Sequence, residues 1–226
     1  MEVFNSIPVD LEPSEVLKSM GMRGSNQQIE EMVQELVEVA RSVAKPKAVY
    51  KVSYIDDKDG DTVTIDGVRF TSRVLRINLD QVERVFPYIA TCGTELEEIA
   101  VPSSDVMKSF CFDAIKVTVV RSATTYLRNH LTEYYALDKM SRMSPGSLES
   151  WPITQQKELF SLFGDTEELI GVRLTESCMI VPLKSVSGIF FPTEIKFESC
   201  QLCPREKCIS RRAPYDPELA KKYREV

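Results

Sequence analysis

The spacing of hydrophobic and polar positions changes several times along the chain. Apolar residues that recur every three to four positions predict four helices, and the run P-E-L-A-K-K-Y-R-E near the end predicts a fifth. The third begins at Ser103 or Ser104, and at about 1.5 Å per residue it spans about 50 Å, so we expect a bend or break near Asn129. The predicted helices cover about residues 13–20, 27–44, 103–137, 154–163 and 217–225.

Shorter apolar segments between turn residues predict antiparallel strands. The segment from Val49 to Tyr54 leads into the polar turn D-D-K-D-G-D, and T-V-T-I-D-G-V-R-F then predicts a hairpin with its turn at Asp66-Gly67. The other predicted strands cover about residues 86–92, 174–182, 185–191 and 194–199.

Helices and strands come in blocks and do not alternate, which favours an α+β fold over a βαβ arrangement. We expect a single domain over residues 1–199, in which a twisted, mainly antiparallel sheet is packed by the long helix and by shorter ones. Residues 200–226 are expected to form a basic, cysteine-containing C-terminal tail.

The composition excludes several classes of protein. The chain of 226 residues is 43% hydrophobic with a net charge of −6, which is unlike a disordered protein. It has no run of about 18 apolar residues and no basic, then apolar start typical of a signal peptide, so we expect a soluble, cytoplasmic protein. The pI of 5.1 gives no basic face for nucleic acid.

Scarce residue types exclude several chemistries. The chain has one histidine, His130, so a zinc site of the H-E-x-x-H type is impossible, and its helical setting favours a structural role over a catalytic one. The D-x-H-x-x-G pattern that ligates cobalamin is absent. The nine glycines are too widely spaced for a G-x-G-x-x-G loop, which argues against a Rossmann-type methyltransferase.

The six cysteines fall into two groups. Cys92, Cys111 and Cys178 are isolated among apolar residues and are expected to be buried. In C-Q-L-C-P-R-E-K-C, Cys200, Cys203 and Cys208 have the close spacing of thiolates that ligate an iron–sulfur cluster or zinc, although a fourth ligand is not evident. Reduced thiols in a C-terminal loop are the alternative.

Charge is also unevenly distributed. Residues 205–226 contain seven Lys/Arg and four Asp/Glu, a charge of +3, while the other 204 residues contain 21 basic and 30 acidic residues, a charge of −9. A basic tail on an acidic body can bind an acidic partner or a phosphate-bearing cofactor, but a solvated terminal helix has the same composition.

The segment R-M-S-P-G-S-L-E-S-W-P, from Arg142 to Pro152, is the strongest candidate for a ligand site. It lies between two predicted helices, and Pro145-Gly146 favours a type II turn that exposes backbone at Gly146. The guanidinium of Arg142 can bind a carboxylate through two hydrogen bonds. An arginine beside exposed carbonyls suits a zwitterionic ligand.

This segment, followed by I-G-V-R-L-T-E-S-C-M-I-V-P-L-K-S-V-S-G-I-F-F, resembles the reactivation domain of cobalamin-dependent methionine synthase. That family has an R-x-x-P-G-Y-P loop with L-T-E-S and S-V-S-G about thirty residues later, and the strong match covers about Met140 to Phe191. The resemblance implies an activation-domain-like fold that binds S-adenosylmethionine and presents its methyl group to cobalamin held by a partner.

The resemblance also implies a function. We expect a stand-alone reactivation partner of a cobalamin-dependent methionine synthase that lacks its own reactivation domain, because the 226 residues contain no other domain of that enzyme. Inactive cob(II)alamin is rescued in the family by one-electron reduction, from flavodoxin or a ferredoxin-type protein, and by methylation. The chain is then the accessory half of a methyltransferase and not a complete enzyme.

The resemblance assigns site residues by position. Arg142 corresponds to the arginine that meets the ligand carboxylate, Ser144 and Gly146 take the backbone-contact positions, and Ser147 stands where the family has tyrosine. The family's acidic contact falls near Arg121, which is not acidic, so no residue is assigned to the ligand ammonium. Glu176, in L-T-E-S, is a candidate for that acid, with a structural role at a strand start as the alternative.

Two other functions are consistent with the same residues. The chain can activate a different corrinoid protein, with a cluster held by the cysteines of the C-terminal tail. It can also be a docking module that orders the partner's cobalamin domain without binding S-adenosylmethionine, which Ser147 and Arg121 would explain.

Overall fold

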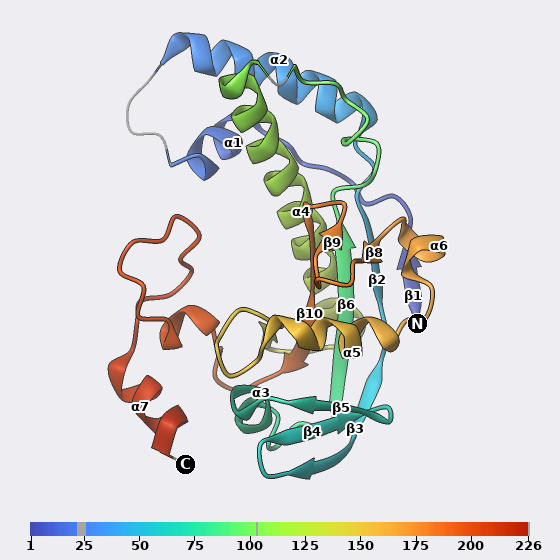
Figure 1. Cartoon of the computed structure of the whole chain (residues 1–226), viewed down its shortest axis with the longest axis vertical. Helices are drawn as coiled ribbons and strands as arrows, with labels where there is room; N and C mark the ends of the chain where they lie inside the picture. Colours follow the sequence, from blue (N-terminus) through green and yellow to red (C-terminus); the bar gives the residue numbers. More distant parts are fainter. Residues whose placement is uncertain (22–25, 103, 226) are drawn as a thin grey trace.

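In the computed structural model, residues 1–21, 26–102 and 104–225 are described, apart from the side chains of residues 224 and 225. The N-terminal half begins with a short edge strand and two helices and continues with a run of short strands (Figure 1). Its elements are β1 (Glu2–Phe4), α1 (Pro13–Ser19), α2 (Gln27–Val43), β2 (Lys47–Tyr50), β3 (Ser53–Asp59), β4 (Thr62–Ile65), β5 (Val68–Thr71), α3 (Arg73–Asn78) and β6 (Arg84–Thr91).

The C-terminal half opens with the long helix and ends with the tail (Figure 1). Its elements are α4 (Val106–Tyr134), β7 (Met140–Met143), the 3₁₀ helix η1 (Ile153–Gln155), α5 (Gln156–Ser161), α6 (Thr166–Ile170), β8 (Arg173–Leu174), β9 (Ile180–Val181), β10 (Ser185–Pro192), the 3₁₀ helix η2 (Ser199–Leu202) and α7 (Pro217–Glu225).

The main sheet is built around β6. On one side β6 pairs with β2 and β3, and on the other with β10, which in turn pairs with the edge strand β7. β1 extends the sheet beyond β2, and β4 and β5 extend it beyond β3. Every pairing described is antiparallel, so the predicted fold class, a single α+β domain with a mainly antiparallel sheet and a long helix, is confirmed.

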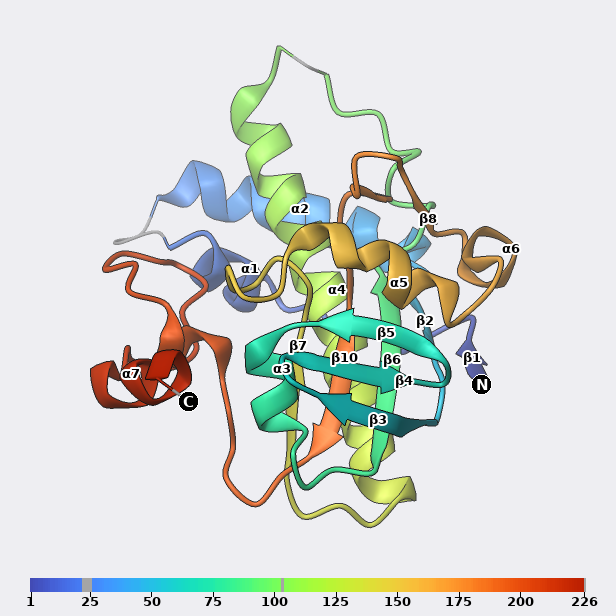
Figure 2. The same ribbon diagram turned by 60° about the horizontal axis from the view of Figure 1, so that its bottom comes forward.

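Helices cover both faces of the central strands, which explains why their sequences are apolar at nearly every position. Along β6 and β10, residues such as Ile89 and Phe191 point to the face covered by α5, while Tyr88 and Phe190 point to the face covered by α4. Figure 2 shows α5 on the side of the β3–β5 hairpins, with α4 beyond the sheet. A second cluster joins α1 and α2 to the first half of α4.

The hairpin predicted at Asp66-Gly67 is confirmed. Both residues have positive φ, 47° and 77°, as a two-residue hairpin turn requires. The side chain of Asp66 accepts a hydrogen bond from the Tyr54 backbone N–H and lies 2.8 Å from the Lys51 ammonium. Burial raises the pKa of this carboxyl, but the Lys51 and backbone bonds outweigh burial and hold the pKa below its usual range.

Several predicted elements differ from the structure. The long helix is unbroken through residue 129 and begins after an Asp105 N-cap, not after Ser104, while Ser103 lies outside the described residues. Its buried stripe runs through Cys111, Phe112 and Ile115, and Val106 and Phe110 are exposed. The predicted strand 174–182 is only the short β8–β9 hairpin, the predicted strand 194–199 is absent, and β1, α3 and α6 were not predicted.

The side chain of Gln155 holds the segment after β7 against the β5 strand. The indole N–H of Trp151, which is fully buried, donates to Gln155 Oε1 at 3.2 Å. The same amide accepts from the Thr71 N–H at 3.0 Å and donates to the Thr71 carbonyl at 2.9 Å. The segment that carries the candidate ligand residues is therefore fixed at its far end.

We expect Gln155→Ala to lower the free energy of unfolding by about 1–2 kcal/mol, because it leaves the buried indole N–H without a partner and releases Thr71. Urea unfolding measures the change. Gln34→Ala is the control, since Gln34 is exposed on α2 and its side chain bonds Glu38 on the same helix, and its substitution should shift stability by no more than about 0.5 kcal/mol. Equal effects of the two substitutions would contradict the anchoring role.

Candidate functional site

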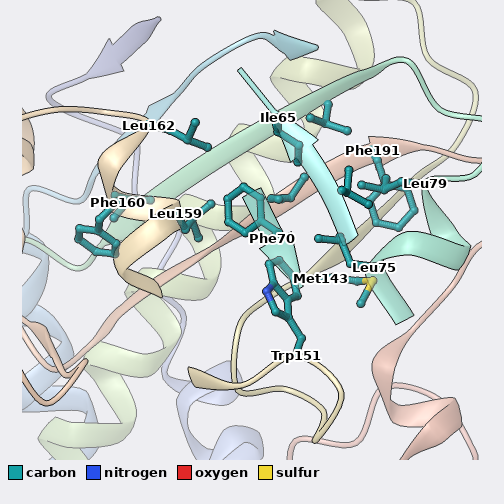
Figure 3. Packing of buried hydrophobic residues seen from close by; sticks show 14 of the residues in the cluster. Ile65, Phe70, Leu75, Leu79, Met143, Trp151, Leu159, Phe160, Leu162 and Phe191 are labelled. Atoms are coloured by element: carbon teal, nitrogen blue, oxygen red, sulfur yellow. The ribbon is translucent and has the colours of Figure 1, made fainter. Parts of the chain in front are cut away.

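Arg142 lies on the edge strand β7 and not in the interhelical loop predicted from the sequence. In the antiparallel register it stands opposite Phe190 of β10, whose ring stacks on Tyr88 with 4.3 Å between centroids. The neighbouring Met143 packs with Trp151 in the α5-side cluster (Figure 3). Because side chains alternate along a strand, Arg142 points to the opposite, α4-covered face, at the open edge of the sheet.

The turn after β7 has the predicted geometry. The Ser147 N–H donates to the Ser144 carbonyl at 3.1 Å, and Gly146 has φ +79°, which with Pro145 before it gives a type II turn. The bare face of Gly146 is occupied, since a Cβ there would lie 2.7 Å from Ile153 Cδ1. Its N–H donates to the Trp151 carbonyl at 2.7 Å, so this donor is used within the turn, although the residue itself is exposed.

Ser144 rests directly on a glycine of the adjacent strand. A Cβ added to Gly188 of β10 would lie 2.7 Å from Ser144 Oγ and would collide with the Met143 carbonyl. Gly188, in S-V-S-G, is therefore a close-packed glycine of the sheet. Gly188 thereby sets how deeply the start of the turn sits against the sheet.

Arg142, Ser144 and Ser147 come together on one small cavity of about 110 Å³. The guanidinium of Arg142 has no hydrogen bond or carboxylate partner among the described residues. The other residues of this cavity were not identified from the sequence. They come from β6, β10, η2 and the C-terminal tail. Its lining is Tyr88, Arg142, Ser144, Ser147, Val186, Ser199 and Arg212.

A larger cavity of about 490 Å³ adjoins the first one at Ser147. Its walls come from α3, from the segment after the turn and from the C-terminal tail, where Tyr223 stacks on Phe197 with 5.7 Å between ring centroids. Burial raises the pKa of the Tyr223 hydroxyl. The tail thus contributes to the candidate site, and the lining is Val74, Ser147, Leu148, Glu149, Ser150, Leu202, Cys203, Pro204, Ala220 and Tyr223.

Glu176 lies elsewhere, on the exposed turn of the β8–β9 hairpin, and lines none of the cavities described here. In this turn Thr175 Oγ1 accepts from the Met179 N–H at 3.0 Å and contacts Ser177 Oγ at 3.0 Å. The L-T-E-S motif therefore forms a tight turn, which supports the structural alternative. Glu149 is the carboxylate that borders the larger cavity, and its position in a loop gave no signal in the sequence.

The cysteines of the tail do not form a metal site in the part of the chain that the structure describes, where no group of three His, Cys, Asp or Glu side chains is placed to hold an ion. The loop is organised around Arg211, whose guanidinium donates to the carbonyls of Cys200, Cys203, Arg205 and Ala213. Ligation by Cys200, Cys203 and Cys208 remains a prediction without structural support.

The pKa of the Cys200 thiol nevertheless differs from that of an ordinary cysteine. Burial raises its pKa, but hydrogen bonds from the backbone N–H groups of Arg212 and Ala213, together with the Arg212 guanidinium, outweigh burial and bring the pKa below the ordinary value. Cys92, Cys111 and Cys178 are buried, as predicted.

His130 is not part of the candidate site. Its ring packs edge-on against Phe4, at 5.0 Å between centroids, and stacks on Tyr134 at 5.7 Å. Nε2 lies 3.6 Å from Glu2 Oε2 and 3.5 Å from the Tyr50 hydroxyl. These contacts tie α4 to β1 and β2, which is the structural role expected from the sequence.

Comparisons with known proteins agree with this fold and this segment. Residues 128–203 match the family model described as "Vitamin B12 dependent methionine synthase, activation domain". The fold is similar to a solved structure described as "Crystal Structure of the MetH Reactivation Domain bound to AdoHcy", with a TM-score of 0.56 and 15% identity over 88% of this chain and 81% of that chain. No curated protein sequence gives a significant match.

The resemblance to the methionine synthase reactivation domain, inferred from R-M-S-P-G-S and S-V-S-G, is thus confirmed. The matched segment begins in the last two turns of α4 and contains β7, the turn after it, β10 and the first two cysteines of the tail. None of the described helices is long and apolar enough to cross a membrane.

Proposed function

We propose that the chain binds S-adenosylmethionine beside Arg142 and presents its methyl group for the reductive methylation of cob(II)alamin held by a partner. The partner is a cobalamin-dependent methionine synthase that lacks its own reactivation domain, and the electron comes from a flavodoxin or ferredoxin-type protein in the cytoplasm. The match of residues 128–203 to the activation-domain family supports this proposal, as does the similarity in fold to a domain solved with AdoHcy.

The observation that carries the proposal is the Arg142 guanidinium, which borders a cavity without a carboxylate partner among the described residues. A guanidinium of this kind suits the ligand carboxylate, with the hydroxyls of Ser144 and Ser147 on the same cavity. The adjoining cavity of about 490 Å³ lies within the range of typical small-molecule sites, and its mainly apolar walls suit the adenosyl group. Glu149 lines this cavity, and a carboxylate accepts hydrogen bonds of the kind that ribose hydroxyls donate.

The chemistry requires positioning more than acid–base catalysis. S-adenosylmethionine supplies a methyl group that its sulfonium already activates for transfer. The task of this chain is to hold the ligand by its carboxylate on β7 and its nucleoside against the tail, so that the methyl is oriented toward the partner. No catalytic residue is therefore assigned, and the chain acts as the accessory half of a methyltransferase.

A rescue assay tests this function. Inactive cob(II)alamin methionine synthase without its reactivation domain is mixed with the chain, S-adenosylmethionine and a reduced flavodoxin or ferredoxin, and methionine formation is followed. We expect turnover to return only when all three additions are present. Failure to recover turnover would overturn the partner assignment.

Calorimetry with S-adenosylmethionine separates the alternatives. Binding in the micromolar range supports the proposal, whereas no binding together with a stable complex with the partner would favour the docking module. The Cys-ligated cluster of the other alternative predicts a coloured, iron-containing protein after anaerobic preparation. A colourless, iron-free protein that supports rescue would exclude that alternative.

A further inference from the structure

A third cavity, of about 90 Å³, shares Arg142 and Arg212 with the cavity of about 110 Å³. It is bounded by the second half of α4, by the β7–β10 edge and by the segment between residues 196 and 212. Five cationic side chains and one carboxylate line it. The charged residues are Arg121, Arg128, Arg142, Lys196, Arg212 and Glu198.

The positive charge in this cavity is not balanced. The carboxylate of Glu198 lies 3.1 Å from Arg212 Nε and 3.5 Å from Lys196 Nζ, so two of the cations share the one acid. Arg121, Arg128 and Arg142 have no ion pair with any described residue. Because a carboxylate cancels one unit of charge, the cavity keeps an excess of about four positive charges.

The helix that supplies two of these arginines offers them no acid. Arg121 and Arg128 are seven residues apart on α4, which is two helical turns, and therefore lie on the same face. Thr124 and Thr125 fill the positions between them and also line the cavity. No acidic residue stands three or four positions from either arginine on α4, so the helix itself does not neutralise their charge.

We propose that this cavity binds a phosphate-class oxyanion, either free phosphate or the phosphate group of an ester. At about 90 Å³ the cavity is well below the roughly 300–1,000 Å³ of sites for drug-sized ligands, which favours a small anion over a nucleoside. Guanidinium groups match the oxygen spacing of phosphate, and the Thr125 hydroxyl adds an uncharged donor, whereas the Thr124 hydroxyl donates to the Val120 carbonyl.

This site is distinct from the carboxylate site of the proposed function. A single carboxylate is satisfied by the Arg142 guanidinium and the serine hydroxyls on the 110 Å³ cavity, which Arg121, Arg128 and Lys196 do not line. The surplus cations Arg121, Arg128 and Lys196 therefore serve a second anion, although Arg142 and Arg212 line both cavities.

Isothermal titration of the full chain with inorganic phosphate, in a low-salt buffer near pH 7.5, tests the proposal. We expect saturable binding that weakens as NaCl is added. The double variant Arg121→Gln/Arg128→Gln should bind phosphate at least about fivefold more weakly. Lys196→Gln, at the other wall, should weaken binding in the same direction.

Arg69→Gln/Arg173→Gln is the matched control, because it removes the same charge from two exposed arginines that do not line the cavity. We expect this control to keep the parent affinity for phosphate. Absence of saturable binding up to about 10 mM phosphate, unchanged binding in Arg121→Gln/Arg128→Gln, or equal losses in the control would each overturn the proposal.

Two further arms identify the source of the oxyanion and separate this proposal from the previous one. Methyl phosphate that binds as well as inorganic phosphate indicates an ester carried by a cofactor or substrate, whereas its exclusion indicates free phosphate. The double variant should keep S-adenosylmethionine binding within about threefold. Loss of phosphate binding alone would therefore identify a second site, and loss of both ligands together would overturn the separation of the two cavities.

Discussion

Replacing Arg142 by alanine should reduce the affinity for S-adenosylmethionine by about 10- to 100-fold. The guanidinium borders the cavity without a carboxylate partner among the described residues, so it is free to bind the ligand carboxylate. Hydrogen bonds to charged groups contribute about 1.5–3 kcal/mol, which corresponds to that range of affinity. Isothermal titration of parent and variant measures the loss.

Two variants make this result specific. Arg142→Lys keeps the charge but not the planar pair of donors, so an intermediate affinity is expected. Arg173→Gln removes an exposed arginine outside the cavities and should leave the affinity unchanged. If Arg142→Ala bound S-adenosylmethionine as tightly as the parent protein, the ligand could not lie where we place it.

Replacing Gly188 by alanine should lower the free energy of unfolding by about 2–3 kcal/mol and also weaken ligand binding. The added methyl would meet the Met143 carbonyl and lie 2.7 Å from Ser144 Oγ, and the Tyr88 ring is 3.1 Å away. Overpacking of this kind typically costs about 1–3 kcal/mol, and here one obstacle is backbone, which cannot rotate away. Urea unfolding and titration with S-adenosylmethionine measure the two effects.

Gly164→Ala controls for the loss of a glycine in itself. Nothing lies within 4 Å of a Cβ at Gly164, although its φ of +76° makes the change unfavourable for the backbone alone. We expect a smaller loss of stability there, and no loss of ligand binding. Ser144→Ala combined with Gly188→Ala should not restore stability, because the Met143 carbonyl remains; full restoration would show that the hydroxyl was the obstacle.

The parts of the fold that local sequence determines were predictable. The Asp66-Gly67 turn, the apolar face of α2 and the continuous apolar run of β6 each depend on residues close in the chain. β7 was missed because M-S-R-M is short and its pairing partner, β10, lies more than forty residues later. The long helix was expected to bend, yet its two ends are held by different clusters that together keep it continuous.

The turn of the candidate site was predictable from the sequence, but the residues that line its cavity were not. Pro145-Gly146 specifies a type II turn from local chemistry, and Arg142 is the only arginine beside it. Tyr88, Ser199 and Arg212 come from distant segments, and no local pattern indicates that they meet. Glu176 lies instead in a tight turn whose hydrogen bonds Thr175 supplies, and no local signal in T-E-S separates a ligand contact from this structural role.

The linkage from Gly146 through Trp151 to Gln155 and Thr71 has a consequence for how fast a ligand is captured. The N–H of Gly146 donates to the Trp151 carbonyl, and the indole N–H of Trp151 donates to the Gln155 side-chain amide. That amide also forms hydrogen bonds with the backbone N–H and carbonyl of Thr71. A segment constrained at both ends gives up little conformational entropy on association. Encounters should therefore proceed as rigid docking without a slow rearrangement, and differences in affinity among related ligands should arise mainly from their rates of departure.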